Sequence, residues 1–211
     1  MKIRVFIADD HAVIRDGLRA LLEPYFDVVG SAANGREAVR LISECSPAVA
    51  ILDIAMPELN GIEATRLLRQ KQSGVRVVIL SMHCSSEHVF RAFEAGADGY
   101  LLKESASDEI VAAVRTTYAG RRYLCREIEA LALSLGDKAQ GTSPLASLSA
   151  REREVLQLVV EGRSSAEIGH LIYLSPKTVE TYRSRLMKKL GIADLPALVR
   201  FAIEHGLTPP A

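Results

Sequence analysis

The sequence predicts two domains of different class, an N-terminal α/β domain and a C-terminal all-α domain, joined by a linker. Through about residue 120, short apolar segments typical of buried strands alternate with segments of helical periodicity. Residues 136–144 are polar, rich in Gly, Ser and Pro, and show no hydrophobic period, which is typical of a linker. After this segment only helical patterns and helix-capping motifs occur.

The N-terminal domain is predicted to be a five-stranded parallel sheet with helices on both faces. The expected strands are Arg4–Ala8, Val28–Ser31, Ala48–Leu52, Val75–Leu80 and Gly99–Leu102. The expected helices are His11–Leu22, Arg36–Ser43, Ile62–Gln70, Glu87–Ala95 and Asp108–Tyr118. Asn34 and Ser107 are predicted N-caps, and Gly96 and Gly120 stand where helix-ending glycines belong. Five βα units with short loops favour the flavodoxin-like strand order 2-1-3-4-5.

The C-terminal domain is predicted to contain four helices. S-x-x-E capping boxes at Ser149 and Ser164 begin the first two, and Ser175-Pro176 begins the third. Asp194 is the expected cap of the fourth. The spacing of apolar residues also allows a short helix over 126–135, before the linker. We expect the domains to span residues 1–122 and 146–211, with the linker at 123–145.

The composition limits the class of protein but does not indicate a binding partner. The 211 residues include 26 Lys and Arg and 26 Asp and Glu, so local charge must identify any binding surface. Cys45, Cys84 and Cys125 are too scattered for a disulfide framework or a CxxC metal site. The first residues lead into a strand rather than a signal peptide, and no apolar run reaches membrane-spanning length. We therefore expect a cytoplasmic protein with no membrane partner.

Polar side chains occupy the carboxyl ends of four predicted strands. Asp9 and Asp10 follow the first strand, Asp53 the third, Ser81 the fourth and Lys103 the fifth. These ends meet at one edge of a parallel sheet, so the carboxylates should converge there. Converging carboxylates repel each other unless a cation lies among them, and hard oxygen ligands with an incomplete shell suit Mg²⁺. The set therefore predicts a site where a phosphoryl group is placed on Asp53, with Mg²⁺ and Lys103 offsetting the charge.

A combination of motifs at these strand ends identifies a family resemblance. The motifs are Asp9-Asp10, Asp53-x-x-Met56-Pro57-x-x-x-Gly61, Ser81, Gly96-Ala97-x-Gly99-Tyr100 and Lys103. Together they resemble the receiver domain of bacterial two-component response regulators, over residues 1 to about 120. The resemblance implies that Asp53 accepts phosphate from the phosphohistidine of a sensor histidine kinase.

The same resemblance implies roles for the neighbouring residues. Asp10, Asp53 and the Ala55 backbone carbonyl would ligate Mg²⁺, and Asp9 would bind it through water. Ser81 and Lys103 would move onto the phosphoryl oxygens, and Tyr100 would rotate inward as Ser81 shifts. One departure is Glu104, because many receivers have a cis proline after the lysine. A cis bond before a non-proline residue costs about 3 kcal/mol, so that geometry is not expected here.

The third C-terminal helix is amphipathic and basic on its polar side. Val179, Leu186 and Leu190 form an apolar stripe, with Tyr182 or Arg183 filling the middle turn. Lys177, Thr181, Ser184 and Lys188 lie on the opposite side, and Arg183, Arg185 and Lys189 flank them. A basic polar helix face on a compact helical unit suits the major groove of DNA.

Further motifs connect this helix to a known module. They are Leu148-Ser149-x-Arg151-Glu152-x-Glu154-Val155-Leu156, Gly162, Glu167-Ile168, Leu174-Ser175-x-Lys177-Thr178-Val179 and Lys189-Leu190-Gly191. They resemble the LuxR-type helix-turn-helix over roughly residues 145–207. A receiver followed by this module resembles the NarL/FixJ type of response regulator, and the two resemblances cover nearly the whole chain. The resemblance implies that Pro176–Leu190 is the recognition helix and that Leu195–Ile203 makes a homodimer contact. The expected DNA-binding residues are Lys177, Thr178, Glu180, Thr181, Arg183, Ser184, Arg185 and Lys188.

Within that set, Glu180, Thr181 and Ser184 occupy the usual base-facing positions, whereas the basic residues are better placed to hold phosphates. Glu180 could accept a hydrogen bond from cytosine N4 or repel a phosphate, and the sequence leaves both open. The chain departs from the family at Gly169, where Ala is usual, and at Tyr182, where His is common. Ser165-Ala166 also replaces a common Asn-Lys pair.

We therefore expect a transcription factor rather than an enzyme. Its partners would be a sensor histidine kinase, promoter DNA and a second copy of the chain, with RNA polymerase as a further candidate. One alternative is a receiver that binds DNA without phosphorylation. Another is a phosphohydrolase of haloacid dehalogenase type, which would need an acid where Ala55 stands. A third is redox or metal sensing through His83, Cys84 and His88.

Overall fold

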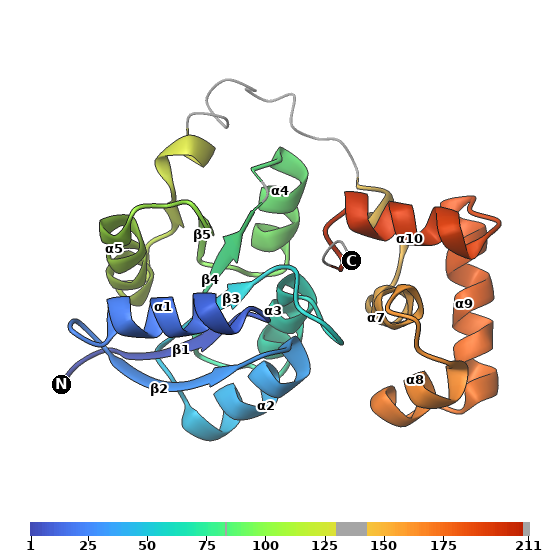
Figure 1. Ribbon diagram of the computed structural model, residues 1–211, viewed down its shortest axis with the longest axis horizontal. Helices are drawn as coiled ribbons and strands as arrows, with labels where there is room; N and C mark the ends of the chain where they lie inside the picture. The colour runs from blue at the N-terminus through green and yellow to red at the C-terminus, as the bar shows by residue number, and fades with distance from the viewer. Residues whose placement is uncertain (83, 130–142, 209–211) are drawn as a thin grey trace. The chain divides into compact units, whose positions relative to one another are not determined.

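The computed structural model describes residues 1–82, 84–129 and 143–208, within two compact units (Figure 1). The units are Met1–Gln140 and Gly141–Ala211. The first is an α/β unit, and the described part of the second is helical. Residues 126–129 are helical, and the remainder of the short helix predicted over 126–135 lies outside the described ranges. Among the helices that the structure describes, none has the length and hydropathy needed to cross a membrane.

The α/β unit contains a parallel sheet in the order β2-β1-β3-β4-β5-β6. The strands are β1 (Arg4–Ala8), β2 (Asp27–Ala32), β3 (Val49–Asp53), β4 (Arg76–Ser81), β5 (Gly99–Leu102) and β6 (Tyr123–Leu124). The five predicted strands and their order are confirmed, and β6 extends the edge beside β5. Two residues are too few to show a hydrophobic period. The strand forms because the Tyr123 N–H donates to Asp98 O at 3.0 Å and the Cys125 N–H donates to Tyr100 O at 3.1 Å.

Five helices connect these strands, close to the predicted ranges. They are α1 (Ala12–Leu22), α2 (Gly35–Cys45), α3 (Gly61–Gln70), α4 (Ser86–Glu94) and α5 (Ser107–Tyr118). α2 packs on α3 and α3 on α4, while α5 packs against β3 to β6 (Figure 1). β3 is buried along its whole length, and Phe6 and Ile7 of β1 and Tyr100 of β5 are also completely buried. The sheet is therefore a rigid platform whose carboxyl edge presents the residues that follow each strand.

The predicted helix signals are mostly confirmed. The Asn34 side chain accepts from the Glu37 N–H at 2.8 Å. Gly96 and Gly120 adopt φ angles of +99° and +79°, in the left-handed region that ends helices. The prediction that Ser107 caps α5 is wrong, because Ala106 holds the extended N-cap position and Ser107 is already inside the helix.

The helical unit begins with a short 3₁₀ turn and continues with four helices. These are η2 (Pro144–Ser147), α7 (Ala150–Val160), α8 (Ser165–Ile172), α9 (Pro176–Leu190) and α10 (Leu195–Glu204). Both predicted capping boxes, Ser149/Glu152 and Ser164/Glu167, are present. α9 packs on α7 and α8, and its Val179 and Leu186 are completely buried, as the apolar stripe predicts. The opposite side of α9 is consequently left at the surface of this unit.

Candidate functional site

The carboxyl edge of the sheet brings together acids and a lysine from distant parts of the chain. Lys103 Nζ lies 2.7 Å from Asp9 Oδ2 and 2.8 Å from Asp53 Oδ2. The side chains of Asp9 and Asp53 are almost fully buried, at 0% and 3% exposure. The expected convergence of these three residues is therefore present, with the lysine ammonium between the two carboxylates.

Asp10 and His11 form the more open side of the same cluster. His11 Nδ1 lies 2.7 Å from Asp10 Oδ1 and 3.5 Å from Asp9 Oδ1. Potential ligand atoms of Asp9, Asp10, His11 and Asp53 all lie within 4.8 Å of one another. His11 was absent from the residues predicted for this site, and the only signal in the sequence is its position directly after Asp9-Asp10.

The carboxylates of this cluster outnumber the positive charges that contact them. Burial, and next the neighbouring Asp9 charge, raise the pKa of Asp53 to about 6, although Lys103 opposes the rise. Burial alone would lower the pKa of Lys103, but the Asp53 and Asp9 carboxylates together raise it. The single ammonium of Lys103 therefore neutralises two carboxylates only in part. A set of hard oxygen donors with excess negative charge fits a divalent cation such as Mg²⁺.

The loop that carries the two adjacent acids is held by Arg15 from α1. Its guanidinium donates to Asp9 O at 2.7 Å and to Asp10 O at 3.0 Å. The His11 N–H also donates to Asp9 Oδ1 at 2.9 Å. These bonds satisfy both loop carbonyls and restrict the direction of the Asp9 carboxylate. Arg15 was not predicted from the sequence, because a basic residue on a surface helix carries no local signal of this role.

The turn after β3 depends on close backbone approach. The Gly61 N–H donates to Ile54 O at 2.9 Å, and a Cβ at Gly61 would lie only 2.1 Å from Asp53 O. Asn60 caps α3 by accepting from the Glu63 N–H at 2.9 Å. This compact turn contains Ala55, the residue whose carbonyl is the predicted metal ligand. That role remains a prediction.

Ser81 and Tyr100, the two residues predicted to move on phosphorylation as a switch, are both fully buried. Burial raises the pKa of the Tyr100 hydroxyl above its usual range, and a hydrogen bond with Ser81 partly offsets that rise. The Lys103 N–H donates to Ser81 O at 2.8 Å, which links the end of β4 to the residue after β5. No cis peptide bond occurs among residues 1–82, 84–129 and 143–208, in agreement with Glu104 in place of proline.

The residues considered for redox or metal sensing do not form a ligand set within the described structure. His83 lies outside the described residues. Cys84 is exposed, whereas His88 is buried with Nδ1 2.6 Å from Ser85 Oγ. Within the described ranges, the group of side chains spaced to hold a metal ion is the acidic cluster around Asp53.

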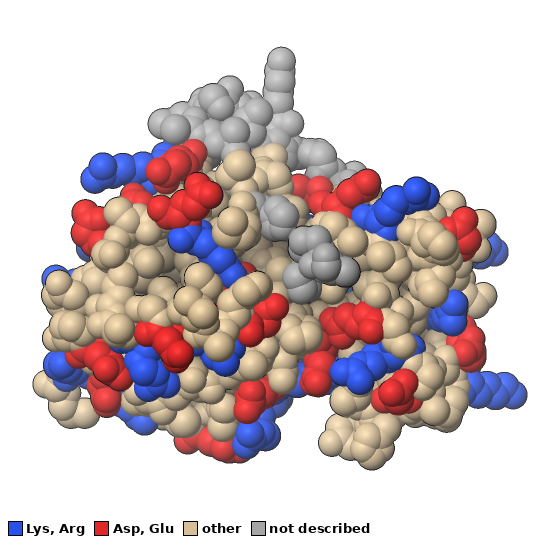
Figure 2. Space-filling model, viewed as in Figure 1, with Lys and Arg blue, Asp and Glu red and all other residues tan. Residues whose placement is uncertain are grey.

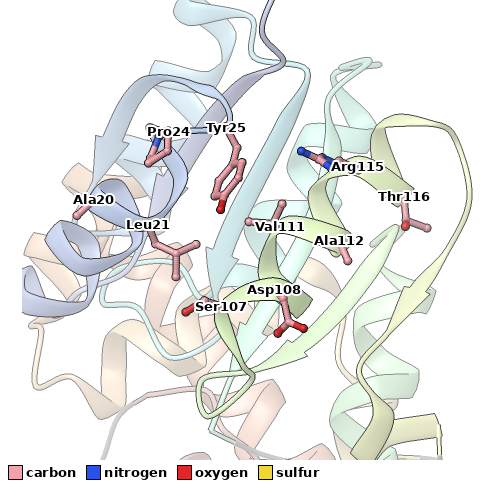
Figure 3. Close-up of a pocket in the computed structure, with 10 residues that line it drawn as sticks. All are labelled: Ala20, Leu21, Pro24, Tyr25, Ser107, Asp108, Val111, Ala112, Arg115 and Thr116. Carbon is pink, nitrogen blue, oxygen red and sulfur yellow. The ribbon is translucent and has the colours of Figure 1, made fainter.

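A hollow lies elsewhere in the α/β unit, between α1 and α5 (Figure 3). Its volume is about 760 Å³, and Leu21, Tyr25, Val111 and Arg115 contribute to its lining. The Arg115 guanidinium lies 5.9 Å from the centre of the Tyr25 ring, so the two sides of the hollow are linked by a cation–π contact. The hollow brings together fewer titratable groups than the acidic cluster, so it is a weaker candidate for chemistry.

The helical unit presents the polar face of α9. Lys177, Glu180, Thr181, Ser184, Arg185 and Lys188 are exposed, and Thr178 and Arg183 are half-buried. Lys and Arg side chains project from the molecular surface where Figure 1 has α9, interspersed with acids (Figure 2). Their contacts with DNA remain predictions.

Two side chains near this face have partners that the sequence did not indicate. Lys189 Nζ lies 2.7 Å from Glu152 Oε2 on α7, so this lysine connects two helices of the unit. The Ser165 hydroxyl at the start of α8 donates to Glu180 Oε1 on α9. Gly169 is also explained, because a Cβ there would lie 2.5 Å from Leu174 O in the α8–α9 turn.

Comparison with known families divides the chain as its two units do. Residues 5–115 match the family described as the response regulator receiver domain. Residues 146–202 match the family described as bacterial regulatory proteins, luxR family. Both families are regulatory.

Relatives match along nearly the whole chain. The transcriptional regulatory protein MctR of Rhizobium johnstonii is 39% identical over 210 residues, which are 98% of this chain and 95% of MctR. The response regulator UvrY of Escherichia coli K12 is 38% identical over 208 residues, which are 97% of this chain and 95% of UvrY. A solved complex of the two-component response regulator RcsB with DNA is 25% identical, with a TM-score of 0.60. That likeness covers 95% of this chain and 98% of the RcsB chain.

Proposed function

Because this chain belongs to the two-component response regulators with a receiver domain and a LuxR-type DNA-binding domain, we propose that Asp53 is its phosphoryl acceptor. The donor is the phosphohistidine of a sensor histidine kinase. The observation that carries this proposal is the contact of Asp53 with Lys103 inside a cluster of buried acids. This cluster places a nucleophile beside a fixed positive charge.

The chemistry is a transfer of the phosphoryl group from nitrogen to oxygen. A carboxylate oxygen of Asp53 attacks phosphorus, the new P–O bond forms as the P–N bond breaks, and the electron pair remains on the histidine nitrogen. With a pKa of about 6, Asp53 is mostly ionised at neutral pH and able to attack. Mg²⁺ held by Asp10, Asp53 and the Ala55 carbonyl, with Asp9 acting through water, would offset the charge on the phosphoryl oxygens.

Lys103 and Ser81 then act on the product. The ammonium of Lys103 contacts Asp9 and Asp53 before phosphorylation. In the product it donates one of its hydrogen bonds to a phosphoryl oxygen instead. The Ser81 hydroxyl donates to another, which weakens its bond with Tyr100. The phosphoryl group adds nearly two negative charges, so the altered contacts bias the conformation of the receiver around the buried Tyr100.

The output of this change is DNA binding by the helical unit in the cytoplasm. α9 enters the major groove with Glu180, Thr181 and Ser184 toward the bases, while Lys177, Arg183, Arg185 and Lys188 hold phosphates. α10 contributes to a homodimer, so two half-sites lie about one helical turn apart. Transcription changes through the bound promoter, with RNA polymerase as a further partner.

Labelling with acetyl phosphate in Mg²⁺ tests the proposal directly. The wild-type protein should incorporate one phosphoryl group per chain, and Asp53→Asn should abolish the labelling. Asp16→Asn is a matched control, because this acid lies exposed on α1 outside the cluster. Undiminished labelling of Asp53→Asn would refute the assignment. Absence of labelling in the wild-type protein would support a receiver that works without phosphate.

A further inference from the structure

The contact between Ser165 and Glu180 joins the two helices of the helix-turn-helix. Ser165 is the first residue of α8, and its hydroxyl donates to Glu180 Oε1 on α9. The close α8–α9 turn permits this contact, because Gly169 has no side chain to push Leu174 away. The carboxylate of Glu180 is therefore held at one oxygen by a residue that lies outside the recognition helix.

Glu180 lies among the exposed polar residues of α9. Lys177 and Ser184 lie three residues before it and four residues after it on the same side of the helix, and both are exposed. The Thr181 hydroxyl donates to Lys177 O at 3.0 Å, so its hydrogen is already used within the helix. At the centre of a mostly basic face, the chain thus presents a negatively charged hydrogen-bond acceptor.

The chemistry of this acceptor selects among the bases. An ionised carboxylate accepts hydrogen bonds and cannot donate them. In the major groove, guanine presents the acceptors N7 and O6, thymine presents the acceptor O4, and adenine presents a donor beside the acceptor N7. Cytosine presents the N4 donor, which makes it the best match for a single carboxylate oxygen.

We propose that Ser165 positions the Glu180 carboxylate so that its second oxygen accepts a hydrogen bond from the N4 amino group of cytosine. Glu180 is then a specificity-determining residue and Ser165 its positioning residue. The inference rests on the proposed DNA-binding function and adds to it the identity of one base pair. In this role Glu180 reads a base and does not act by repelling a phosphate.

Selection from a pool of duplexes with a randomised central segment tests this assignment. The full chain is used after treatment with acetyl phosphate and Mg²⁺, with thermal unfolding measured in parallel. For the wild-type protein we expect a position at which cytosine is preferred roughly tenfold, as is typical of a good base contact. Glu180→Gln should move the preference at this position toward adenine, because glutamine pairs with adenine N6 and N7.

Ser165 is tested with a pair of variants. Ser165→Ala should reduce the cytosine preference several-fold without changing the thermal midpoint, whereas Ser165→Thr retains a hydroxyl and should restore the preference. Ser147→Ala is the matched control, because its exposed hydroxyl bonds to Pro144 O in η2. It should leave the preferred sequence unchanged.

Three outcomes would overturn the inference. If Glu180→Gln changes affinity equally for all sequences, Glu180 acts on phosphates and reads no base. If Ser165→Ala keeps the full cytosine preference, Ser165 has no positioning role. If the wild-type protein enriches no sequence at all, the proposed function fails and the inference falls with it. If instead the wild-type protein and every variant enrich the same motif, the proposed DNA-binding function stands and only the inference about Glu180 and Ser165 is overturned.

Discussion

The ammonium nitrogen of Lys103 lies 2.8 Å from Oδ2 of Asp53, although β4 separates the strands that carry these two residues. The contact exists because all the strands run parallel and end at one edge. It also places a positive charge directly beside the proposed nucleophile.

Replacing Lys103 by Met should slow labelling by acetyl phosphate on the order of 100-fold, because the developing phosphoryl charge loses a preorganised donor. The measurement is the initial rate of phosphorylation in saturating Mg²⁺. Lys71→Met is the control, since Lys71 is an exposed residue at the end of α3. A Lys103→Met rate within twofold of the wild type would contradict the role assigned to the ammonium.

Asp53→Asn should stabilise the protein at neutral pH in EDTA. Burial and the neighbouring Asp9 charge raise the pKa of Asp53 to about 6 from an ordinary 3.8, so its ionised form is unfavourable in the folded state. A rise of this size corresponds to a cost on the order of 3 kcal/mol when the group is ionised in both states. The gain in unfolding free energy should approach this value above pH 6 and disappear below pH 3.8.

Urea unfolding of the wild type and Asp53→Asn at pH 7.5 and pH 3.5 measures this effect. Mg²⁺ should narrow the difference at pH 7.5, because a cation stabilises the wild-type carboxylates more than the variant. Asp16→Asn again serves as the exposed control. The electrostatic account would be wrong if Asp53→Asn lowered the unfolding free energy equally at both pH values.

Gly61→Ala should destabilise the turn after β3 by about 2–3 kcal/mol, since it introduces a methyl group into a packed site. The added Cβ would lie 2.1 Å from Asp53 O, so the backbone of the nucleophile must shift and phosphorylation should slow as well.

Gly17→Ala is the matched control. Nothing lies within 4 Å of a Cβ at Gly17, which is in α1, and alanine there should stabilise the helix by about 0.5–1 kcal/mol. Thermal unfolding and labelling rates check both variants. Equal effects of the two substitutions would show that close approach at Gly61 is unimportant.

Lys188→Ala should weaken binding to all duplex sequences, because a phosphate contact is lost. The slope of the logarithm of the binding constant against the logarithm of the salt concentration should fall by about one unit in magnitude. The measurement is the dissociation constant between 50 and 200 mM salt, a range in which such contacts are sensitive. An unchanged slope would remove Lys188 from the set of phosphate contacts.

Lys189→Ala should act on stability instead of on DNA binding. Burial raises the pKa of Glu152, but hydrogen bonds from Lys189 and Ser149 outweigh this effect and the net pKa is lowered. Loss of the 2.7 Å contact between Lys189 and Glu152 should cost about 1 kcal/mol, allowing for the exposure of the lysine. The difference from wild type should be present at neutral pH and fall as Glu152 is protonated below its ordinary pKa. A large loss of DNA affinity with unchanged stability would contradict this assignment.

The sequence alone determined the alternation of strands and helices, their order in the sheet and the presence of Asp9, Asp53, Ser81 and Lys103 at the strand ends. These features are encoded locally, in hydrophobic period, capping residues and the position of a polar residue after a strand. The capping box at Ser149 and the buried stripe of α9 illustrate how directly such patterns translate into structure.

Only the tertiary structure decided the partners of individual side chains. β6, the contacts of His11 and Arg15 in the acidic loop, and the bond between Ser165 and Glu180 have no periodic signature. Each depends on groups that come within hydrogen-bonding distance only after separate elements have packed. The physical reason is that periodicity specifies which face of an element is buried, whereas the pairing of polar atoms requires positions fixed by the whole fold.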